Sequence, residues 1–287
     1  MGTSAFFSAA SLRELVAGAL DEDLGRGDIT STACIAAEIR GSADFMSREA
    51  LVLCGLPLAK EVFLQVDPEL RFEVFAYEGE RCEANTKIAS VSGAARSILM
   101  GERVALNFLQ RLSGVATLTR RFVDAARSGG RAKITDTRKT TPGLRAFERY
   151  AVRCGGGINH RYDLSSAVLI KDNHIAAAGG LKAAVEGARR FASHTMKIEC
   201  EVDHLDQLEE ALACGVDIVL LDNFDDAQLA EAVRINAGRA LLEASGGVQL
   251  ARVASIAATG VDVISVGALT HSAPAVDIGL DWSASAP

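Results

Sequence analysis

The spacing of hydrophobic residues divides the chain into two stretches. In the first, helix-type spacing over 12–24 follows a Ser11 cap and stops at the turn 25–28. Short strand-like runs separated by turns come next, at 41–47, 51–57, 70–80 and 86–97. This pattern predicts a compact, largely antiparallel unit that ends near residue 95.

A long helical pattern follows this unit, over 98–127. Ser113-Gly114 interrupts the pattern and is the predicted domain boundary. We therefore expect an N-terminal α+β domain over 1–113 and a second domain over 114–272. The C-terminal tail 273–287 is expected to join the N-terminal domain, with Trp282 anchoring it there.

Beyond residue 130 the chain alternates between strands and helices. Strands are predicted at 132–136, 166–171, 196–202, 216–222, 240–245 and 261–267, and helices at 144–153, 180–192, 204–213, 225–236 and 248–258. Repeated strand–helix units indicate a parallel sheet, and six of them favour a closed or nearly closed α/β barrel. An open doubly wound sheet is the alternative. No GxGxxG follows the first strand, which weakens a dinucleotide-binding interpretation.

Composition narrows the classes of function. The chain has 287 residues, of which 49% are hydrophobic and 23% charged, with a net charge of −7. An acidic balance argues against general binding to nucleic acids or membrane surfaces. No apolar run approaches the roughly 20 residues of a spanning helix, and the segment 1–10 has no basic region typical of a signal peptide.

Six cysteines are scattered along the sequence, with no CxxC and no clustering with histidine. This spacing argues against a zinc site or a disulfide framework. We expect reduced thiols in a cytoplasmic protein.

A basic island lies inside this acidic chain. Residues 131–174 contain nine Lys/Arg against four Asp/Glu, a local charge of +5. Arg145, Arg149 and Arg153 are four residues apart, as on a solvated helix face. The other cations of interest fall where strands stop: Arg138, Lys139, Arg161 and Lys171. Sites of α/β proteins are built at the carboxyl ends of strands, so an anion site is favoured there over a solvated face.

Acidic residues mark the ends of two later strands. Alternation along the strand 196–202 puts Glu199 and Glu201 on the same face. Glu199 lies deeper and is predicted to be a partner for buried cations, because an unpaired buried charge is costly. Glu201 and Asp222 lie at the rim, where they can meet ligand hydroxyls or a divalent cation. Oxygen ligands of this kind suit Mg²⁺.

Two late glycine loops suggest a phosphate site. Ser245-Gly246-Gly247 precedes a predicted helix, and Gly267-Ala268 follows the next strand. Bare backbone N–H groups at such positions can approach a phosphate.

These residues lie in blocks that together resemble one family, the quinolinate phosphoribosyltransferases (nicotinate-nucleotide pyrophosphorylase, carboxylating). The blocks run in order over nearly the whole chain: DLGRGDITS (23–31), GERVALNFLQRLSG (101–114), TDTRKTTPGLR (135–145), CGGGINHR (154–161), LIKDNH (169–174), ECEVD (199–203), LLDN (220–223), EASGG (243–247) and ISVGALTHS (264–272).

The resemblance implies a fold and a reaction. The fold is an α/β barrel of the type II phosphoribosyltransferase kind with an N-terminal α+β sandwich domain. The reaction converts quinolinate and 5-phosphoribosyl-1-pyrophosphate into nicotinate mononucleotide, pyrophosphate and CO₂, in de novo NAD synthesis. Mg²⁺ would be the cofactor, and the enzyme would be a cytoplasmic homodimer.

The resemblance also assigns roles to residues. Quinolinate's carboxylates would be surrounded by Arg138, Lys139, His160, Arg161 and Lys171, with Arg103 from the other subunit and Thr137 alongside. Lys139 and Lys171 would also reach the pyrophosphate and, with Glu201 and Asp222, form the catalytic set. Glu201 and Asp222 would hold the ribose hydroxyls and Mg²⁺. The phosphate end would be bound by Ser245, Gly246, Gly247, Val266, Gly267, Ala268 and His271.

One position departs from the family pattern. The residue two positions after Arg161 is expected to be glycine, but here it is Asp163. We expect its carboxylate to face solvent in the turn. Two alternatives remain open at this point. One is a ModD-like homologue associated with molybdenum transport, which shares the TRKT segment. The other is a non-catalytic anion-binding homologue, although such a protein need not keep Glu201 and Asp222 together with every cation.

Overall fold

In the computed structural model, which describes residues 6–283, the chain forms two compact units. Unit 1 comprises 1–118, 141–156 and 273–287, and unit 2 comprises 119–140 and 157–272. The segment 1–10, interpreted above as lacking a signal peptide, begins outside the described residues, and the tail 273–287 ends outside them. Within 6–283, no helix is both long and apolar enough to cross a membrane.

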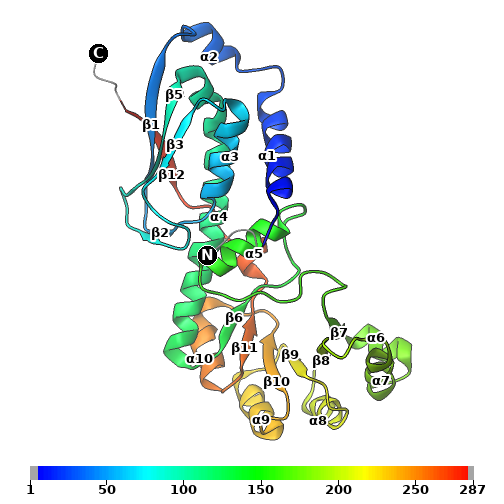
Figure 1. Cartoon of the computed structure of the whole chain (residues 1–287). Coiled ribbons are helices and arrows are strands. Elements are labelled where there is room, and N and C mark those ends of the chain that lie inside the picture. The colour runs from blue at the N-terminus through cyan, green and yellow to red at the C-terminus, as the bar shows by residue number, and fades with distance from the viewer. Residues whose placement is uncertain (1–5, 284–287) are drawn as a thin grey trace. The chain divides into compact units, whose positions relative to one another are not determined.

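Unit 1 is built on a four-stranded antiparallel sheet in the order β12-β1-β5-β3 (Figure 1). Its strands are β1 (Arg40–Ser47), β3 (Arg71–Val74), β5 (Lys87–Ala94) and β12 (Ile278–Ser283). A small second sheet pairs β2 (Leu51–Val52) with β4 (Arg81–Cys82). Trp282, in β12, lies opposite Ala43 of β1, so residues Ile278–Ser283 of the tail form a strand of this unit.

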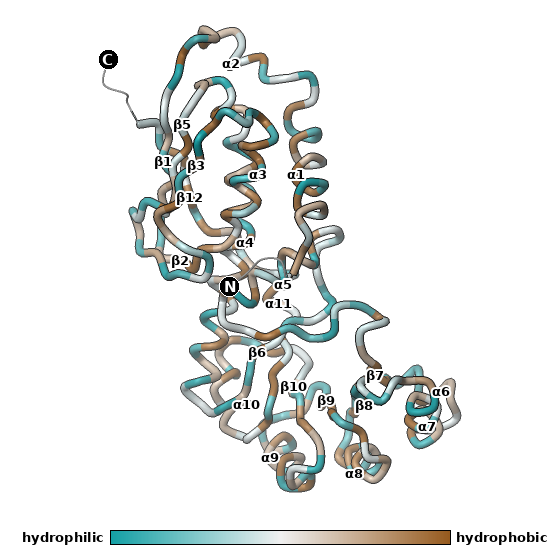
Figure 2. The backbone as a smooth tube through the Cα atoms, in the orientation of Figure 1, coloured by the Kyte–Doolittle hydropathy of each residue, from teal (hydrophilic) through white to brown (hydrophobic). Residues whose placement is uncertain are grey.

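The helices of unit 1 are α1 (Ala9–Leu24), α2 (Ile29–Cys34), α3 (Leu56–Val66), the first part of α4 (Ala95–Gly129) and α5 (Arg145–Cys154). Apolar residues of α1, α3 and α4 form one core with the sheet, in which Val16, Phe63 and Leu109 pack with Phe45 and Ile88. Figure 2 shows brown and teal segments alternating along α1 and α3, as expected for helices with one buried face.

Unit 2 contains a six-stranded parallel sheet in the order β6-β11-β10-β9-β8-β7. The strands are β6 (Lys133–Thr135), β7 (Val168–Ile170), β8 (Ile198–Val202), β9 (Ile218–Asp222), β10 (Leu241–Ser245) and β11 (Val263–Ser265). The helices are α6 (Asp172–Ala178), α7 (Leu181–Phe191), α8 (Leu205–Ala213), α9 (Asp226–Asn236), the 3₁₀ turn η2 (Leu250–Arg252), α10 (Val253–Ala258) and α11 (Ala268–His271). The predicted α/β fold class and all six predicted strands are confirmed.

Several sequence predictions were wrong in detail. The first helix is capped by Ser8, whose hydroxyl accepts the N–H of Ser11, so it begins before the predicted cap. Helix α3 was missed because the apolar run 51–57 was interpreted as a strand, whereas the strand ends at Val52. Helices α2, α6 and α11 were also missed; they are short and lack a full hydrophobic period. Arg145, Arg149 and Arg153 are half-buried rather than solvated.

The predicted break at Ser113-Gly114 is absent, because α4 runs through it without interruption. Both residues make contacts within unit 1 instead. Ser113 Oγ accepts the N–H of Cys54 at 2.9 Å and donates to its carbonyl at 2.9 Å. A Cβ on Gly114 would stand 2.0 Å from the carbonyl oxygen of Pro274. The small residues therefore allow close packing against a helix that does not break, and the division at residue 113 stays a prediction.

This packing gives a testable result. Alanine normally stabilises a helix interior relative to glycine by about 0.5–1 kcal/mol, but Gly114→Ala should destabilise the protein by about 1–3 kcal/mol because of overpacking. Gly18→Ala is the matched control, since Gly18 lies in α1 with nothing near the added methyl group. Urea unfolding of both variants measures the difference. Stabilisation by Gly114→Ala would contradict the tight contact.

Candidate active site

A cavity of about 280 Å³ lies wholly within unit 2. It is lined by Thr137, Arg138, Lys139, His160, Arg161, Leu169, Lys171, Glu201, Leu220, Asp222, Glu243, Ser245 and Ser265. These residues come from the ends of all six strands or from the segments that follow them. The site therefore has the position expected in an α/β protein, where the carboxyl ends of parallel strands meet at one edge.

The register of the sheet explains why these side chains converge. Ser245 of β10 lies beside Asp222 of β9, and Leu220 lies beside both Glu201 of β8 and Glu243 of β10. Side chains at alternate positions of a strand share a face. The predicted site residues Glu201, Asp222 and Ser245 thus face one space together with Glu243, which was not predicted.

His160 is held over two buried carboxylates. Its Nε2 lies 3.2 Å from Glu199 Oε2 and 3.5 Å from Glu243 Oε1. Its backbone N–H donates to Asp136 Oδ1 at 2.8 Å, and Nδ1 accepts the N–H of Arg161 at 2.8 Å. Burial lowers the pKa of His160, but the hydrogen bond with Glu199 and the charges of the surrounding acids outweigh burial and raise it. Glu199 was predicted to be a partner for buried cations, and in the structure it lies against His160, which is cationic when protonated.

Glu243 is the most perturbed acid of the cavity. Burial, followed by the charge of Glu199, raises its pKa to about 7, and the charge of His160 opposes this shift. Two carboxylates this close, buried together, cannot both be charged without a cationic neighbour. His160 supplies that neighbour, so the three side chains form one electrostatic group.

Lys171 forms an ion pair with Glu201. The sequence analysis did not predict this ion pair. Lys171 directly follows β7 and Glu201 lies in the neighbouring parallel strand β8, so the ends of these strands bring the two side chains together. Asp222 forms a hydrogen bond instead: its Oδ2 accepts a hydrogen bond from Asn223 Nδ2 at 2.7 Å.

Two guanidinium groups approach each other in the cavity. Burial and the positive charge of Arg138 lower the pKa of Arg161. Arg161 Nη1 also donates to the carbonyl of Ala167 at 3.0 Å, which fixes its direction. Like charges brought together in a partly buried site create a positive potential that favours anions.

The carboxylate of Asp163, the residue that departs from the family pattern, forms hydrogen bonds within its own turn. Its Oδ1 accepts the backbone N–H of Ser165 at 2.9 Å and the hydroxyls of Ser165 and Ser166 at 2.7 Å each. These hydrogen bonds lower its pKa to about 2. Asp163 thus orders the loop after Arg161, and the predicted turn is confirmed.

Gly267 allows two predicted ligands to come close. A Cβ at this position would stand 3.1 Å from Lys139 Cδ and 3.2 Å from His271 Nε2. The backbone of Lys139 is held by two further contacts: its N–H donates to Thr137 Oγ1 at 3.0 Å, and its carbonyl accepts Thr270 Oγ1 at 2.7 Å. The segment after β6 and the loop after β11 are therefore joined around Lys139.

The structure brings only part of the predicted site to the cavity wall. Seven predicted residues are outside the lining: Arg103, Gly246, Gly247, Val266, Gly267, Ala268 and His271. Arg103 is exposed on α4 in unit 1, and Val266 is buried. The loop at Gly246-Gly247 has left-handed backbone angles at both glycines. It leads into the 3₁₀ turn η2 rather than directly into an α-helix, which corrects the predicted helix start.

Five residues of this site were missed by sequence reasoning. Asp136, Leu169, Leu220, Glu243 and Ser265 either line the cavity or hold His160. Glu243 could have been found, because it lies two positions before Ser245 on the same face of a strand. The other four look like ordinary strand residues in the sequence.

Comparisons with known proteins agree over most of the chain. Residues 28–113 match the profile described as "Quinolinate phosphoribosyl transferase, N-terminal domain", and residues 115–281 match the corresponding C-terminal domain. The "Nicotinate-nucleotide pyrophosphorylase [carboxylating]" of Mycobacterium leprae is 44% identical over 281 residues, covering 96% of this chain and 98% of that one. A probable enzyme of the same name from Synechocystis is 44% identical over 264 residues, 91% of this chain and 89% of its own.

Solved structures give the same result. The nicotinate-nucleotide pyrophosphorylase from Francisella tularensis matches with a TM-score of 0.93 and 42% identity, over 96% of this chain and 98% of that one. The NadC protein from Streptococcus pyogenes matches with a TM-score of 0.93 and 39% identity over the same shares. Fold, sequence profiles and relatives all agree, and the chain belongs to the quinolinate phosphoribosyltransferase family.

Proposed function

We propose that this protein transfers the phosphoribosyl group of 5-phosphoribosyl-1-pyrophosphate to quinolinate with loss of CO₂, giving nicotinate mononucleotide and pyrophosphate. The family and the names of its relatives support this reaction. The observation that carries it is the cavity itself, in which five cationic or cation-forming side chains gather in a chain of net charge −7. They are Arg138, Lys139, His160, Arg161 and Lys171. A dianionic acid and a pyrophosphate together match that charge.

Quinolinate's two carboxylates fit the arginine side of the cavity. Arg138 and Arg161 present planar guanidinium groups, which bind carboxylates through paired hydrogen bonds. His160, held by Glu199 and Glu243, and Thr137 complete this side. Binding here orients the ring so that its nitrogen can meet the sugar.

The sugar and its phosphates fit the acids and lysines that also line the cavity. Glu201 and Asp222 line the cavity on neighbouring strands and can accept hydrogen bonds from ribose hydroxyls. Lys139 and Lys171 would contact the pyrophosphate. The 5-phosphate would be bound by Ser245, Gly246, Gly247, Gly267, Ala268 and His271. The predicted Val266 does not fit this role, because its side chain is buried and its backbone N–H donates to the carbonyl of Thr135 at 3.0 Å.

The carboxylates at this rim also suit Mg²⁺. Glu201 and Asp222 offer hard oxygen atoms, and no thiol lines the cavity. Mg²⁺ in such sites is held by one or two carboxylates together with substrate phosphates. When bound, it would neutralise charge that develops on the leaving pyrophosphate.

The chemistry needs orientation more than proton transfer. The ring nitrogen forms a bond to ribose C1 while the C1–O bond breaks and its electron pair leaves with pyrophosphate. The lysines stabilise that departing charge, and the arginines hold the weakly nucleophilic nitrogen in line with C1. The resulting pyridinium ring accepts the electron pair of the C2–carboxylate bond as CO₂ leaves. A proton from water then restores the aromatic C–H.

The cation cluster predicts a strong preference for the substrate with two carboxylates. Nicotinate would leave one cationic partner unpaired in a desolvated site, at a cost of about 2–5 kcal/mol, or roughly 30-fold to several-thousand-fold in kcat/KM. Steady-state kinetics with quinolinate and nicotinate measure this ratio. Comparable kcat/KM values for the two acids would refute the assignment of the arginine side.

Asp222→Asn tests the proposed metal ligand. The change should lower kcat/KM by about 10–100-fold and raise the Mg²⁺ concentration needed for half-maximal rate, while quinolinate binding measured by calorimetry changes little. Asp206→Asn is the matched control, because Asp206 is an exposed acid in the first turn of α8. Full turnover of the wild-type enzyme in excess chelator would count decisively against Mg²⁺ dependence.

We also propose a cytoplasmic two-fold homodimer in which Arg103 of one subunit completes the partner's cavity. Arg103→Ala and Lys139→Ala chains should each be nearly inactive. After subunit exchange, each mixed dimer would hold one native site and one doubly defective site, so roughly a quarter of all sites should recover. Exchange verified by mass spectrometry with no recovered activity would exclude the shared site.

A further inference from the structure

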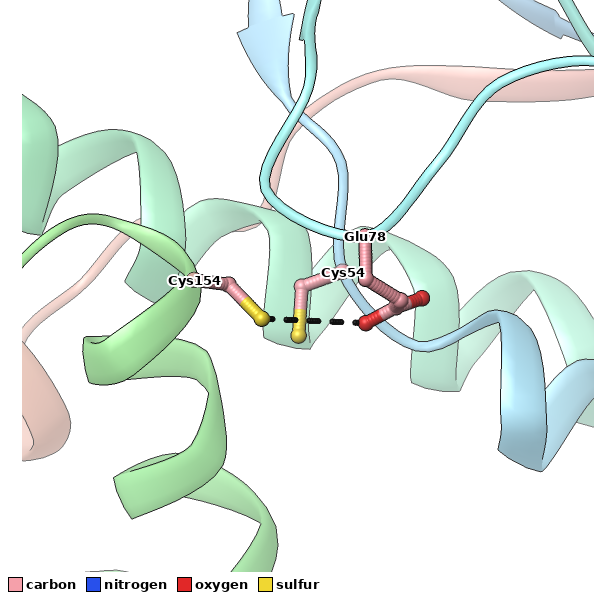
Figure 3. A group of neighbouring side chains, drawn as sticks. All are labelled: Cys54, Glu78 and Cys154. Carbon is pink, nitrogen blue, oxygen red and sulfur yellow. Dashed lines mark hydrogen bonds between the residues drawn. The ribbon is translucent and has the colours of Figure 1, made fainter. Parts of the chain in front are cut away.

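Unit 1 contains a group of side chains of the types that commonly bind metals, and this group plays no part in the reaction proposed above. Figure 3 shows Cys54, Glu78 and Cys154 pointing toward one another. Cys54 precedes α3, Glu78 lies in the turn between β3 and β4, and Cys154 ends α5. Their sulfur and oxygen atoms all lie within 4.8 Å of one another. The three residues are far apart in the sequence, so the scattered cysteines gave no sign of this group.

The spacing fits tetrahedral coordination. Cys154 Sγ lies 3.8 Å from Glu78 Oε2. A zinc ion with bonds of about 2.3 Å to sulfur and about 2.1 Å to oxygen separates two such ligands by roughly 3.6 Å. The pair formed by Cys154 and Glu78 is therefore already close to this separation, and Cys54 Sγ lies within 4.8 Å of both atoms.

Two of the three ligands, Cys54 and Glu78, are held in place by hydrogen bonds. Ser113 binds both the N–H and the carbonyl of Cys54. Glu78 Oε1 accepts the backbone N–H groups of Gly55 at 3.0 Å and Leu56 at 2.7 Å. Hydrogen bonds of this kind orient a metal ligand and fix its geometry. They also cap the start of α3, which is the structural role Glu78 has without any metal.

Two buried thiolates and a buried carboxylate would place several negative charges close together, so these groups must either stay protonated or bind a cation. Both thiols are buried, and burial raises the pKa of Cys54 and of Glu78. The side chain of Tyr150 has no exposed surface, and among residues 6–283 its hydroxyl finds no partner with hydrogen-bond geometry. Burial and the charges of Glu78, Cys154 and Cys54 raise the pKa of Tyr150, so its hydroxyl lies beside this group. A divalent cation would replace the thiol protons and satisfy the negative charge at once.

We propose that Cys54 Sγ, Cys154 Sγ and a Glu78 carboxylate oxygen form a binding site for one soft divalent cation, of which Zn²⁺ fits best, with Tyr150 beside the fourth position. Two thiolates exclude Mg²⁺, which prefers oxygen ligands, so this site is separate in chemistry from the cavity of unit 2. The site is structural. It joins the end of α5 to the segments at Cys54 and Glu78, all within unit 1.

Cadmium titration tests the proposal, because thiolate ligands give an ultraviolet charge-transfer absorption that oxygen ligands do not. The reduced, chelator-treated full-length chain should take up one equivalent of Cd²⁺ with this absorption, and Zn²⁺ should displace it. Cys54→Ser and Cys154→Ser should each weaken binding by at least about tenfold. Cys34→Ser, which removes an exposed thiol, and Asp222→Asn should bind as the wild type does.

A second measurement keeps the proposal testable if a serine variant folds poorly. One equivalent of Zn²⁺ should raise the Tm of the wild-type chain, since a ligand that binds the folded state stabilises it. Glu78→Gln should reduce that rise. The proposal is overturned if the wild type shows no thiolate absorption at one equivalent of Cd²⁺, or if Cys154→Ser binds Cd²⁺ unchanged. It is equally overturned if Cys54 and Cys154 form a disulfide and the reduced chain takes up no metal.

Discussion

The cavity of unit 2 depends on the acids buried beneath its cations. Glu199 and Glu243 contact His160 from β8 and β10, and Asp136 accepts both the N–H of His160 and the side-chain amide of Asn159 at 2.6 Å. Without these acids, a cluster of cations in a partly buried space would repel itself and resist desolvation. The negative charges of the acids reduce the repulsion within the cluster, while the arginines and lysines remain available to bind anionic ligands.

Much of the fold and part of the site could be predicted, because both follow from local pattern. Strands of unit 2 are short apolar runs, and the cations Arg138, Lys139 and Lys171 stand directly after two of them. The sequence also placed Glu201 and Asp222 at strand ends. What the sequence could not predict are contacts between segments that lie far apart along the chain. Nothing near Glu201 in the sequence shows that Lys171 is paired with it, and nothing near Gly114 shows that Pro274 packs against it.

The same limit applies to chemistry in unit 1. Cysteine spacing is a reliable guide to a metal site only when the ligands lie on one loop or hairpin. Cys54 and Cys154 come together because β2, α4 and α5 fold into one unit, with Ser113 of α4 holding the backbone of Cys54. The helix that was predicted to break at Ser113 is thus the element that positions one of the thiols.

Depth along a strand decides what an acid can do. Glu199 and Glu201 lie on the same face of β8, two residues apart. Glu199 is buried and lies against His160, so its carboxylate interacts with the protein rather than with a ligand. Glu201 is half-buried and contacts Lys171, whose side chain is 42% exposed, so this pair remains open to exchange with a ligand. A phosphate arriving at Lys171 would release Glu201 for hydroxyls or a cation. The ion pair between Lys171 and Glu201 is therefore compatible with the catalytic roles proposed for both residues, because each would exchange one oppositely charged partner for another.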